Sequence, residues 1–390
     1  MSKLEELIEE LCPDGVEYKK LKEVAQISAG GDLPRNYAKG QKVATEQYPY
    51  PIYSNGTEGG ALYGFTDSYK IEKEAVTVSA RGTIGYHEVR AGKFTPIVRL
   101  ITLIADESKI TTKFLHYALY IAGIEGVTTG IPSLTVPMLG KFTIPIPPLP
   151  VQNEIVRILD NFTELTAELT AELIARKKQY EYYKDKLFLF DDSIPVVTTK
   201  DVSVERFWLM PATPKYISDG ISYITSKNVR NGVIDFKDVK YISKEDYELI
   251  SKNRCVQKND LLITMIGTIG EAAFVDDFAE FYGQNLYLVR MDETKCMRKY
   301  FYYYLTSNII KNSIISKKNA SSQGYIKAGS IDDLSIPLPP LEEQQRIVAI
   351  LDRFDTLCND ISTGLPAEIE ARTKQYEYYR DKLLTFPERA

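Results

Sequence analysis

The side chains that could do chemistry in this chain of 390 residues gather in a basic, tyrosine-rich stretch. Between Arg298 and Lys327 there are six basic residues and no acidic residue, with five tyrosines interleaved. Basic side chains neutralise phosphates, and amides and hydroxyls hydrogen-bond base edges. The stretch therefore favours nucleic-acid binding. A solvated surface loop and, for the tyrosines at 300–304, a helix core remain the plainer interpretations.

Polar loops in both halves of the chain are the predicted DNA contacts. The strongest candidate is the loop 316–327, through Lys317, Lys318, Asn319, Ser321, Ser322, Gln323, Tyr325 and Lys327. The segment 226–232 offers phosphate and base donors through Lys227, Asn228 and Arg230. The matching stretch 126–135 of the first half has hydroxyls but no cation. The predicted contacts there are Thr128, Thr129 and Ser133, with charge supplied by Arg35, Lys39, Lys42 and Arg81.

Motifs for catalysis are missing from the sequence. It has no Asn-Pro-Pro or Asp-Pro-Pro, no G-x-x-x-x-G-K-[ST] phosphate loop and no H-E-x-x-H. Two G-T-I-G segments, at 82–85 and 267–270, are more typical of turns than of a phosphate cradle. We therefore expect a non-catalytic subunit without cofactor or metal. The alternative is a nuclease or methylase with an unrecognised site. The sequence has only two histidines, His87 and His116, and this shortage argues against that alternative.

The composition of the chain limits the classes of protein to which it can belong. The net charge is −5, so a nucleic-acid site must rest on local charge. Four cysteines without C-x-x-C spacing indicate reduced thiols in a cytoplasmic protein. The N-terminal residues predict an acidic amphipathic helix rather than a signal peptide. No apolar run is long enough to span a membrane, so we expect no membrane partner.

The chain contains an internal repeat: its two halves have the same order of conserved and divergent segments. Segment 144–162 aligns with 336–354 without a gap, and KQYEYYKDKL ending at Leu187 recurs as KQYEYYRDKL ending at Leu383. Between these conserved segments lie divergent modules rich in short β-branched runs and turn residues. The predicted class is α+β, with a pseudo-twofold internal repeat. The predicted parts are an N-terminal helix at 1–15, modules at 16–147 and 191–338, and conserved helices at 148–190 and 339–390.

The conserved segments predict two long helices. In the first, apolar residues step by three and four, which is typical of a coiled-coil seam: Ile155, Ile158, Phe162, Leu165 and Leu169. After Leu173 the seam resumes, with its register shifted by four residues, at Tyr180, Tyr183 and Leu187. The second has a matching seam: Ile347, Ile350, Phe354, Leu357, Ile361, Ile369, Tyr376, Tyr379 and Leu383. Gly364 and Pro366 predict a break inside it. An antiparallel coiled coil between the helices is expected; packing of each seam on its own module is the alternative.

The first helix contains a tandem of TAEL units: Thr166, Ala167, Glu168, Leu169, Thr170, Ala171, Glu172 and Leu173. Each unit would add about 6 Å of helix and a net turn of about 40°. One base pair advances DNA by ~3.4 Å and about 35°. One unit would therefore turn whatever follows it by nearly the angle of one base pair, with surplus length. A chance tandem of good helix formers is the alternative.

These motifs resemble the specificity subunit of type I restriction-modification systems. The resemblance rests on PIPPLPVQNEIVRILD at 145–160, PLPPLEEQQRIVAILD at 337–352, the two KQYEYY-x-DKL tails and EELCPDGVEYKKL at 9–21, and it covers the full length. It implies that each module is a target recognition domain for one half of a bipartite double-stranded DNA site. The helices would then form the spacer between the half-sites, with the TAEL tandem setting its length. They would also dock two methyltransferase subunits, which restriction motor-nuclease subunits join. A protein-interaction scaffold that binds no DNA is the alternative.

Overall fold

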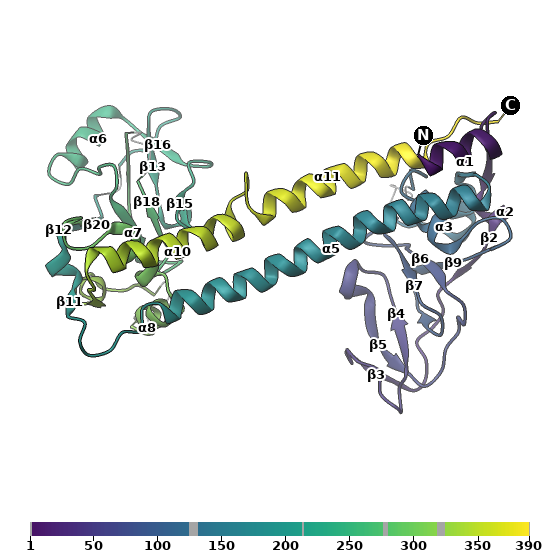
Figure 1. Cartoon of the computed structure of the whole chain (residues 1–390), viewed down its shortest axis with the longest axis horizontal. Helices are drawn as coiled ribbons and strands as arrows, with labels where there is room; N and C mark the ends of the chain where they lie inside the picture. Colours follow the sequence, from purple (N-terminus) through teal and green to yellow (C-terminus); the bar gives the residue numbers. More distant parts are fainter. Residues whose placement is uncertain (1, 125–131, 213, 276–279, 318–323, 390) are drawn as a thin grey trace. The chain divides into compact units, whose positions relative to one another are not determined.

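The computed structural model describes residues 2–124, 132–212, 214–275, 280–317 and 324–389 (Figure 1). The chain divides into two compact units. Unit 1 is Met1–Leu169 with Ile369–Ala390, and unit 2 is Thr170–Glu368. The dividing line falls between the two TAEL copies, so one long helix belongs to both units. The domain bounds that the sequence indicates stay a prediction.

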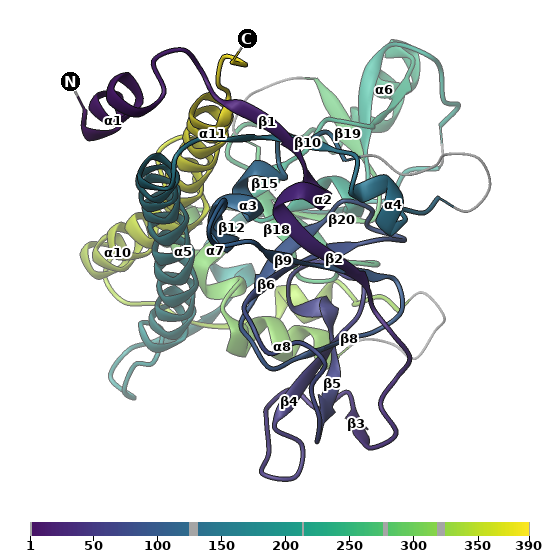
Figure 2. The ribbon, with the colours of Figure 1, turned by 90° about the vertical axis from the view of Figure 1, so that its right-hand side faces the viewer.

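Unit 1 combines short strands with helices that cover them. Its strands are β1 (Glu17–Lys20), β2 (Ala25–Ala29), β3 (Tyr37–Lys39), β4 (Tyr50–Tyr53), β5 (Leu62–Thr66), β6 (Ala75–Ser79), β7 (His87–Arg90), β8 (Thr95–Pro96), β9 (Leu100–Ala105) and β10 (Thr143–Ile146). Its helices are α1 (Lys3–Leu11), α2 (Leu21–Val24), η1 (Glu58–Ala61), α3 (Thr112–Ala118) and α4 (Val136–Leu139), with parts of α5 and α11. The strand orders are β2-β9-β6-β7, β3-β5-β4-β8 and β1-β10. Figure 2 shows β1 beside β10.

Unit 2 has the same kinds of sheet. Its strands are β11 (Val196–Thr198), β12 (Ser203–Leu209), β13 (Ile221–Ile224), β14 (Val229–Arg230), β15 (Val233–Ile234), β16 (Lys240–Ile242), β17 (Leu261–Thr264), β18 (Ala272–Phe274), β19 (Phe281–Gly283), β20 (Leu286–Met291) and β21 (Ser335–Pro337). Its helices are η2 (Thr199–Val202), η3 (Ser226–Asn228), α6 (Lys244–Ser251), α7 (Arg298–Leu305), α8 (Asn308–Ser316), α9 (Gly329–Asp332) and α10 (Leu341–Asn359). The four-stranded sheet has the order β12-β20-β17-β18.

The inner strands β6 and β17 hold the centre of each module. Every residue of both strands is buried, which fits their continuous β-branched and apolar runs. In each module an antiparallel neighbour, β9 or β20, pairs with the inner strand. A parallel pair, β4 with β8 and β13 with β19, lies in a second sheet. The α+β class is confirmed.

Helix α5 (Leu149–Lys186) is continuous over 38 residues. Val151, Ile155 and Leu159 are buried in the module core of unit 1. Phe162 instead stacks on Tyr379 of α11 (Leu365–Leu384), with ring centroids 5.6 Å apart. The predicted seam of α5 therefore divides between module and helix. A coiled coil over both units stays a prediction.

In unit 2 the helix contact is made by other residues of the same seam. Tyr180 of α5 is buried and stacks on Phe354 of α10, with ring centroids 6.0 Å apart. Leu165 and Leu357 both remain 37% exposed, so they fill no seam in the isolated chain. Ile361 is 81% exposed, and its predicted place in the seam is wrong because it lies in a turn between two helices.

The second conserved helix is broken where Gly364 and Pro366 predict it. Helix α10 ends at Asn359 and α11 begins at Leu365. The carboxylate of Asp360 accepts hydrogen bonds from the backbone and hydroxyl groups of Ser362 and Thr363. These bonds lower the pKa of Asp360 to about 2. A Cβ at Gly364 would lie 2.4 Å from the Thr356 carbonyl oxygen, so the turn requires glycine there.

Two matched contacts attach each module to its conserved helix. Gln152 accepts from the Thr111 amide and donates to the carbonyls of Lys109 and Pro147. Gln344 makes the same three bonds with Met297, Lys295 and Pro339. About two turns further on, Asp160 accepts from Tyr117 and Lys113, as Asp352 does from Tyr303 and Lys299. These contacts explain why the helix segments agree so closely while the modules differ.

Replacing Gln344 by alanine should lower the free energy of unfolding by about 2–4 kcal/mol, because it leaves one buried donor and two buried acceptors without partners. Gln344 is fully buried. Urea denaturation followed by circular dichroism measures the change. The control is Gln345→Ala at the exposed neighbour, which should shift stability by less than about 0.5 kcal/mol. Equal shifts for the two variants would contradict the role of the contact.

In the part of the chain that the structure describes, no helix is both long and apolar enough to cross a membrane. All four cysteines are free thiols, as their spacing predicts.

Candidate nucleic-acid interface

Four loops converge at one end of β6 in unit 1, and we name them loop cluster 1: residues 54–57, 80–85, 97–99 and 132–134. The Asn55 amide donates to the Arg81 carbonyl over 3.1 Å. The Ala80 amide donates to the Arg99 carbonyl, and the Ala80 carbonyl accepts from Leu134. The Asn55 bond uses its side-chain amide, whereas the two bonds of Ala80 join backbone atoms and position the loops without using their side chains.

Loop cluster 2 has the same construction at the end of β17: residues 225–228, 265–270, 283–285 and 324–327. The Met265 amide donates to the Asn285 carbonyl, and the Met265 carbonyl accepts from Ile326. The Thr268 hydroxyl donates to the Ser226 carbonyl over 3.2 Å. Both modules therefore present four loops on one backbone frame, although their side chains differ.

The two G-T-I-G segments are turns, as the sequence predicts. They connect β6 to β7 and β17 to β18, and their glycines all have φ between 73° and 83°. Such values favour glycine because other residues carry a Cβ penalty there. The turn amides of Gly85 and Gly270 donate back to Ser79 and Thr264. Their donors are thus used inside the hairpin rather than for a phosphate.

A residue in a strained backbone conformation marks the same place in each cluster. Arg99 has φ 76° and Asn285 has φ 64°. Non-glycine residues rarely adopt this region, and such strain concentrates at functional sites. Arg99 is exposed and adds a cation to loop cluster 1 that sequence reasoning missed. No sequence pattern predicts that Arg99 belongs to this cluster, because its strained φ exists only in the folded chain.

The predicted contacts of unit 1 divide between two regions. Arg81 and Ser133 lie in loop cluster 1, with Arg81 exposed. Arg35, Lys39 and Lys42 are also exposed but lie on or beside β3. Strand β3 is separated from β4, which leads into the cluster, by β5. Thr128 and Thr129 lie outside the described residues.

The predicted contacts of unit 2 gather more closely. Lys227, Asn228, Tyr325 and Lys327 belong to loop cluster 2, and Arg230 lies on the adjoining strand β14. The Asn228 side chain is engaged within its own loop, since it accepts from Thr225 and donates to the Asp235 carbonyl. Lys317 is exposed at the end of α8. Lys318, Asn319, Ser321, Ser322 and Gln323 lie outside the described residues.

In the folded chain, three basic residues of the stretch 298–327 pair with acidic residues from outside the stretch. Arg298 pairs with Glu293, Lys299 with Asp352, and Lys311 with Glu271. Tyr300, Tyr303 and Tyr304 are buried, so the helix-core interpretation is right for them. Among the described residues of this stretch, Lys317 and Lys327 are exposed and form no ion pair.

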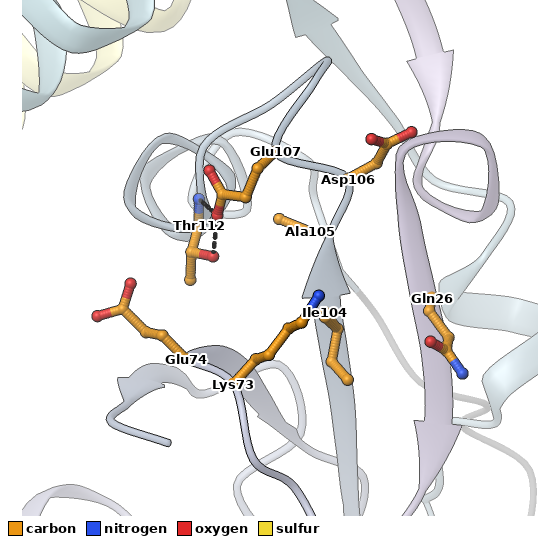
Figure 3. A pocket seen from close by; sticks show the side chains of 8 residues that line it. All are labelled: Gln26, Lys73, Glu74, Ile104, Ala105, Asp106, Glu107 and Thr112. Carbon is orange, nitrogen blue, oxygen red and sulfur yellow. Dashed lines mark hydrogen bonds between the residues drawn. The ribbon is translucent and has the colours of Figure 1, made fainter.

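An acidic cavity of about 450 Å³ in unit 1 lies apart from these loops (Figure 3). Its charged lining residues are three carboxylates and one lysine: Glu74, Asp106, Glu107 and Lys73. Hydrogen bonds from Lys109 and Ser108 lower the pKa of Asp106 to about 2. Glu107 accepts from the amide and hydroxyl of Thr112. Negative charge at this cavity repels phosphates, so we do not assign it to nucleic acid.

The acidic segment recurs and is structural. Asp106-Glu-Ser-Lys109 corresponds to Asp292-Glu-Thr-Lys295. In both, the hydroxyl and amide of the third residue donate to the aspartate, and the lysine pairs with the same aspartate. The lysine carbonyls are those that accept from Gln152 and Gln344. This repeated D-E-[ST]-K signal was visible in the sequence and was missed.

The two histidines lie together beside loop cluster 1. The rings of His87 and His116 are 5.0 Å apart, edge to face. Burial lowers the pKa of His87 and lowers that of His116 to about 3, so both are neutral at neutral pH. His87 Nε2 and His116 Nδ1 have no hydrogen-bond partner in the described structure. Among the described residues, no three His, Cys, Asp or Glu residues are placed to hold a metal ion.

Comparison with known proteins yields one consistent result. The family model described as "Type I restriction modification DNA specificity domain" matches residues 13–178 and 185–371. A putative type I restriction enzyme specificity subunit of Haemophilus influenzae is 34% identical, over 95% of this chain and 96% of its own length. The EcoR124I/EcoR124II specificity subunit of Escherichia coli is 31% identical, over 99% of this chain and 98% of its own length.

Solved structures with the same fold are more distant in sequence. The S subunit of a type I restriction-modification system from M. genitalium has a TM-score of 0.57 at 16% identity, covering 95% of this chain and 96% of its own. A chain from a study of complex assembly in a type I system has a TM-score of 0.60 at 15% identity, covering 96% of this chain and 98% of its own. These likenesses bear on the fold alone.

Proposed function

Because the chain belongs to the family of type I restriction-modification specificity subunits, we propose that each module binds one half of a bipartite, gapped DNA site. The observation that carries the proposal is the pair of loop clusters on one backbone frame. A shared frame would present both half-sites to the same chemistry, and different side chains on it would read different bases. The subunit itself contributes recognition and no catalytic group.

Charge supports the placement of DNA at the loop clusters. Exposed cations lie in or beside both of them, including Arg81 and Arg99 in unit 1 and Lys227, Lys317 and Lys327 in unit 2. Their side chains would neutralise phosphates, and Tyr325 and Ser133 offer hydroxyls to base edges. The net charge of −5 is compatible with this role because acidic residues concentrate elsewhere, as at the cavity of Figure 3.

The conserved helices have two further proposed roles. They set the unread gap, through an antiparallel coiled coil and a pseudo-twofold repeat of the two modules. They also dock two methyltransferase subunits, so that adenine methylation is directed to the site and restriction subunits cleave DNA when they join. The matched contacts of Gln152 and Gln344 support this proposal, since they attach each module to a helix in the same way.

Methylation mapping tests the proposed function. The chain is co-expressed with its methyltransferase subunit in a host without adenine methylation, and methyladenine is mapped across the genome. We expect a motif of two short specified halves around a fixed unspecified gap. If the chain forms a stable complex with the methyltransferase subunit but no DNA is methylated, the result would favour a protein-interaction scaffold. The modules of such a scaffold would bind protein or sugar ligands.

A further inference from the structure

The two loop clusters share a position at which the side chain can hydrogen-bond in both units but differs between them. Arg99 lies there in loop cluster 1, and Asn285 lies there in loop cluster 2. Each directly precedes the strand that pairs with the inner strand, β9 in unit 1 and β20 in unit 2. The carbonyl of each accepts from the amide of the residue after the inner strand, Ala80 or Met265. The two residues are therefore equivalent in the internal repeat.

The backbone at this position is left-handed in both units. Arg99 has φ 76° and Asn285 has φ 64°. In unit 1 the Leu100 amide donates to the Ile97 carbonyl, so Arg99 is the third residue of a four-residue turn. A positive φ at this place in a turn favours glycine or asparagine. The turn therefore accounts for an asparagine in unit 2 but not for an arginine in unit 1, which indicates that unit 1 uses the arginine side chain itself.

Both side chains are available to a ligand. Arg99 is exposed and Asn285 is half-buried. Within the part of the chain that the structure describes, neither the guanidinium of Arg99 nor the side-chain amide of Asn285 forms a hydrogen bond or an ion pair. The neighbouring Gln284 differs, because its Oε1 accepts from the Tyr223 hydroxyl over 3.4 Å. Arg99 and Asn285 can therefore offer all of their hydrogen-bonding groups to DNA.

A difference at equivalent positions indicates a base contact rather than a phosphate contact. The charge of Arg99 alone would suit a phosphate. The DNA backbone is the same in both half-sites, however, so a phosphate contact would favour a cation in both units. Unit 2 instead has the neutral amide of Asn285. Base edges do differ between half-sites, and a side chain that changes between the units is suited to reading them.

The chemistry of the two side chains indicates which bases they read. A guanidinium donates two hydrogen bonds to O6 and N7 of guanine in the major groove. A carboxamide donates to N7 of adenine and accepts from N6. Another matched pair, Ser133 and Tyr325, carries hydroxyl groups. A hydroxyl can donate or accept, so it discriminates less between bases.

We propose that Arg99 reads a guanine in the half-site of unit 1 and that Asn285 reads an adenine in the half-site of unit 2. This inference rests on the proposed function, in which each module binds one half-site. The backbone bonds to Ala80 and Met265 hold the two residues at the same place on the repeated frame. One position of the frame thus determines a different base in each unit.

Fluorescence anisotropy of the complex with methyltransferase subunits tests the assignment, on duplexes that carry the mapped motif with one base pair replaced at a time. Replacing one guanine-cytosine pair of the first half-site should weaken wild-type binding roughly tenfold to a hundredfold. Arg99→Gly should bind the original and the replaced duplex equally and keep full discrimination in the other half-site. Asn285→Gly should lose discrimination at one adenine-thymine pair of that other half-site.

Matched controls separate base reading from turn geometry and charge. Glycine adopts a positive φ without steric cost, so neither variant should melt more than about 2 °C below the wild type. Lys93 is an exposed cation with φ 63°, and Asn259 is an exposed asparagine with φ 74°. Lys93 follows β7 and Asn259 precedes β17, at the ends of these strands remote from the loop clusters. Lys93→Gly and Asn259→Gly should discriminate at every base pair as the wild type does.

The outcomes separate this inference from the proposed function. If the wild type methylates a bipartite motif and Arg99→Gly or Asn285→Gly still discriminates at every base pair, the assignment of that residue is wrong while the proposed function stands. A variant that binds every duplex more weakly by the same factor has lost a phosphate contact, and this result also overturns the assignment. A wild type that methylates no bipartite motif overturns both.

Discussion

A third TAEL unit inserted after Leu173 should lengthen the unspecified gap of the methylated motif by about one base pair and leave both half-sites unchanged. The insertion adds about 6 Å and a net turn of about 40° to α5. One base pair needs ~3.4 Å and about 35°. The rotation that one unit adds to the helix is therefore close to that of one base pair. The added helix length exceeds the rise of one base pair, and another part of the chain must absorb the difference.

The structure offers a place for that surplus. Among the described residues, the helices that cross the division between units are α5, between Leu169 and Thr170, and α11, between Glu368 and Ile369. The tandem lies on the first crossing. The second follows the turn from Asp360 to Gly364, so no single continuous helix fixes the length of that path. The second conserved helix, which is broken between α10 and α11, therefore does not oppose a change in the length of α5.

Genome-wide methylation mapping measures the gap. A length-preserving control, Thr170→Ala, should leave the gap as in the wild type while removing the exact repeat. Insertion of one alanine should instead abolish methylation, because a turn of about 100° points one module away from its half-site. An active enzyme with an unchanged gap after the TAEL insertion would refute the spacer role.

Reversal of Lys317, Lys318 and Lys327 to glutamate should weaken DNA binding by roughly a hundredfold or more at 0.1 M salt. Each phosphate contact contributes about 0.9 to the slope of log K against log salt. Three lost contacts would therefore lower that slope by about 2.7 as well. Fluorescence anisotropy of the complex with methyltransferase subunits, on a duplex carrying the mapped motif, gives both quantities.

A charge-matched control separates local contact from net charge. Lys244, Lys252 and Lys258 are exposed lysines of the same module outside loop cluster 2. Their reversal to glutamate changes the net charge equally and should weaken binding far less. Equal losses in the two triple variants would contradict the assignment of DNA contacts to the loop 316–327. Binding unaffected by the first triple variant would favour the interaction scaffold.

The sequence by itself determined the features that depend on neighbouring residues. The repeated helix segments, the buried β6 and β17, the turns at G-T-I-G and the break at Gly364 to Pro366 all follow from local preferences. A glycine or proline limits the backbone wherever the rest of the chain lies. A continuous apolar run likewise seeks burial on both faces.

The tertiary structure alone decided which of the predicted side chains are available. Lys299 looked free in the sequence but pairs with Asp352, and Lys311 pairs with Glu271. Arg99 acquired a strained place in loop cluster 1, and α5 divided its apolar residues between module and helix. These outcomes join residues that are tens of positions apart. Ion pairs and packing depend on distance in space, which no local pattern of residue types fixes.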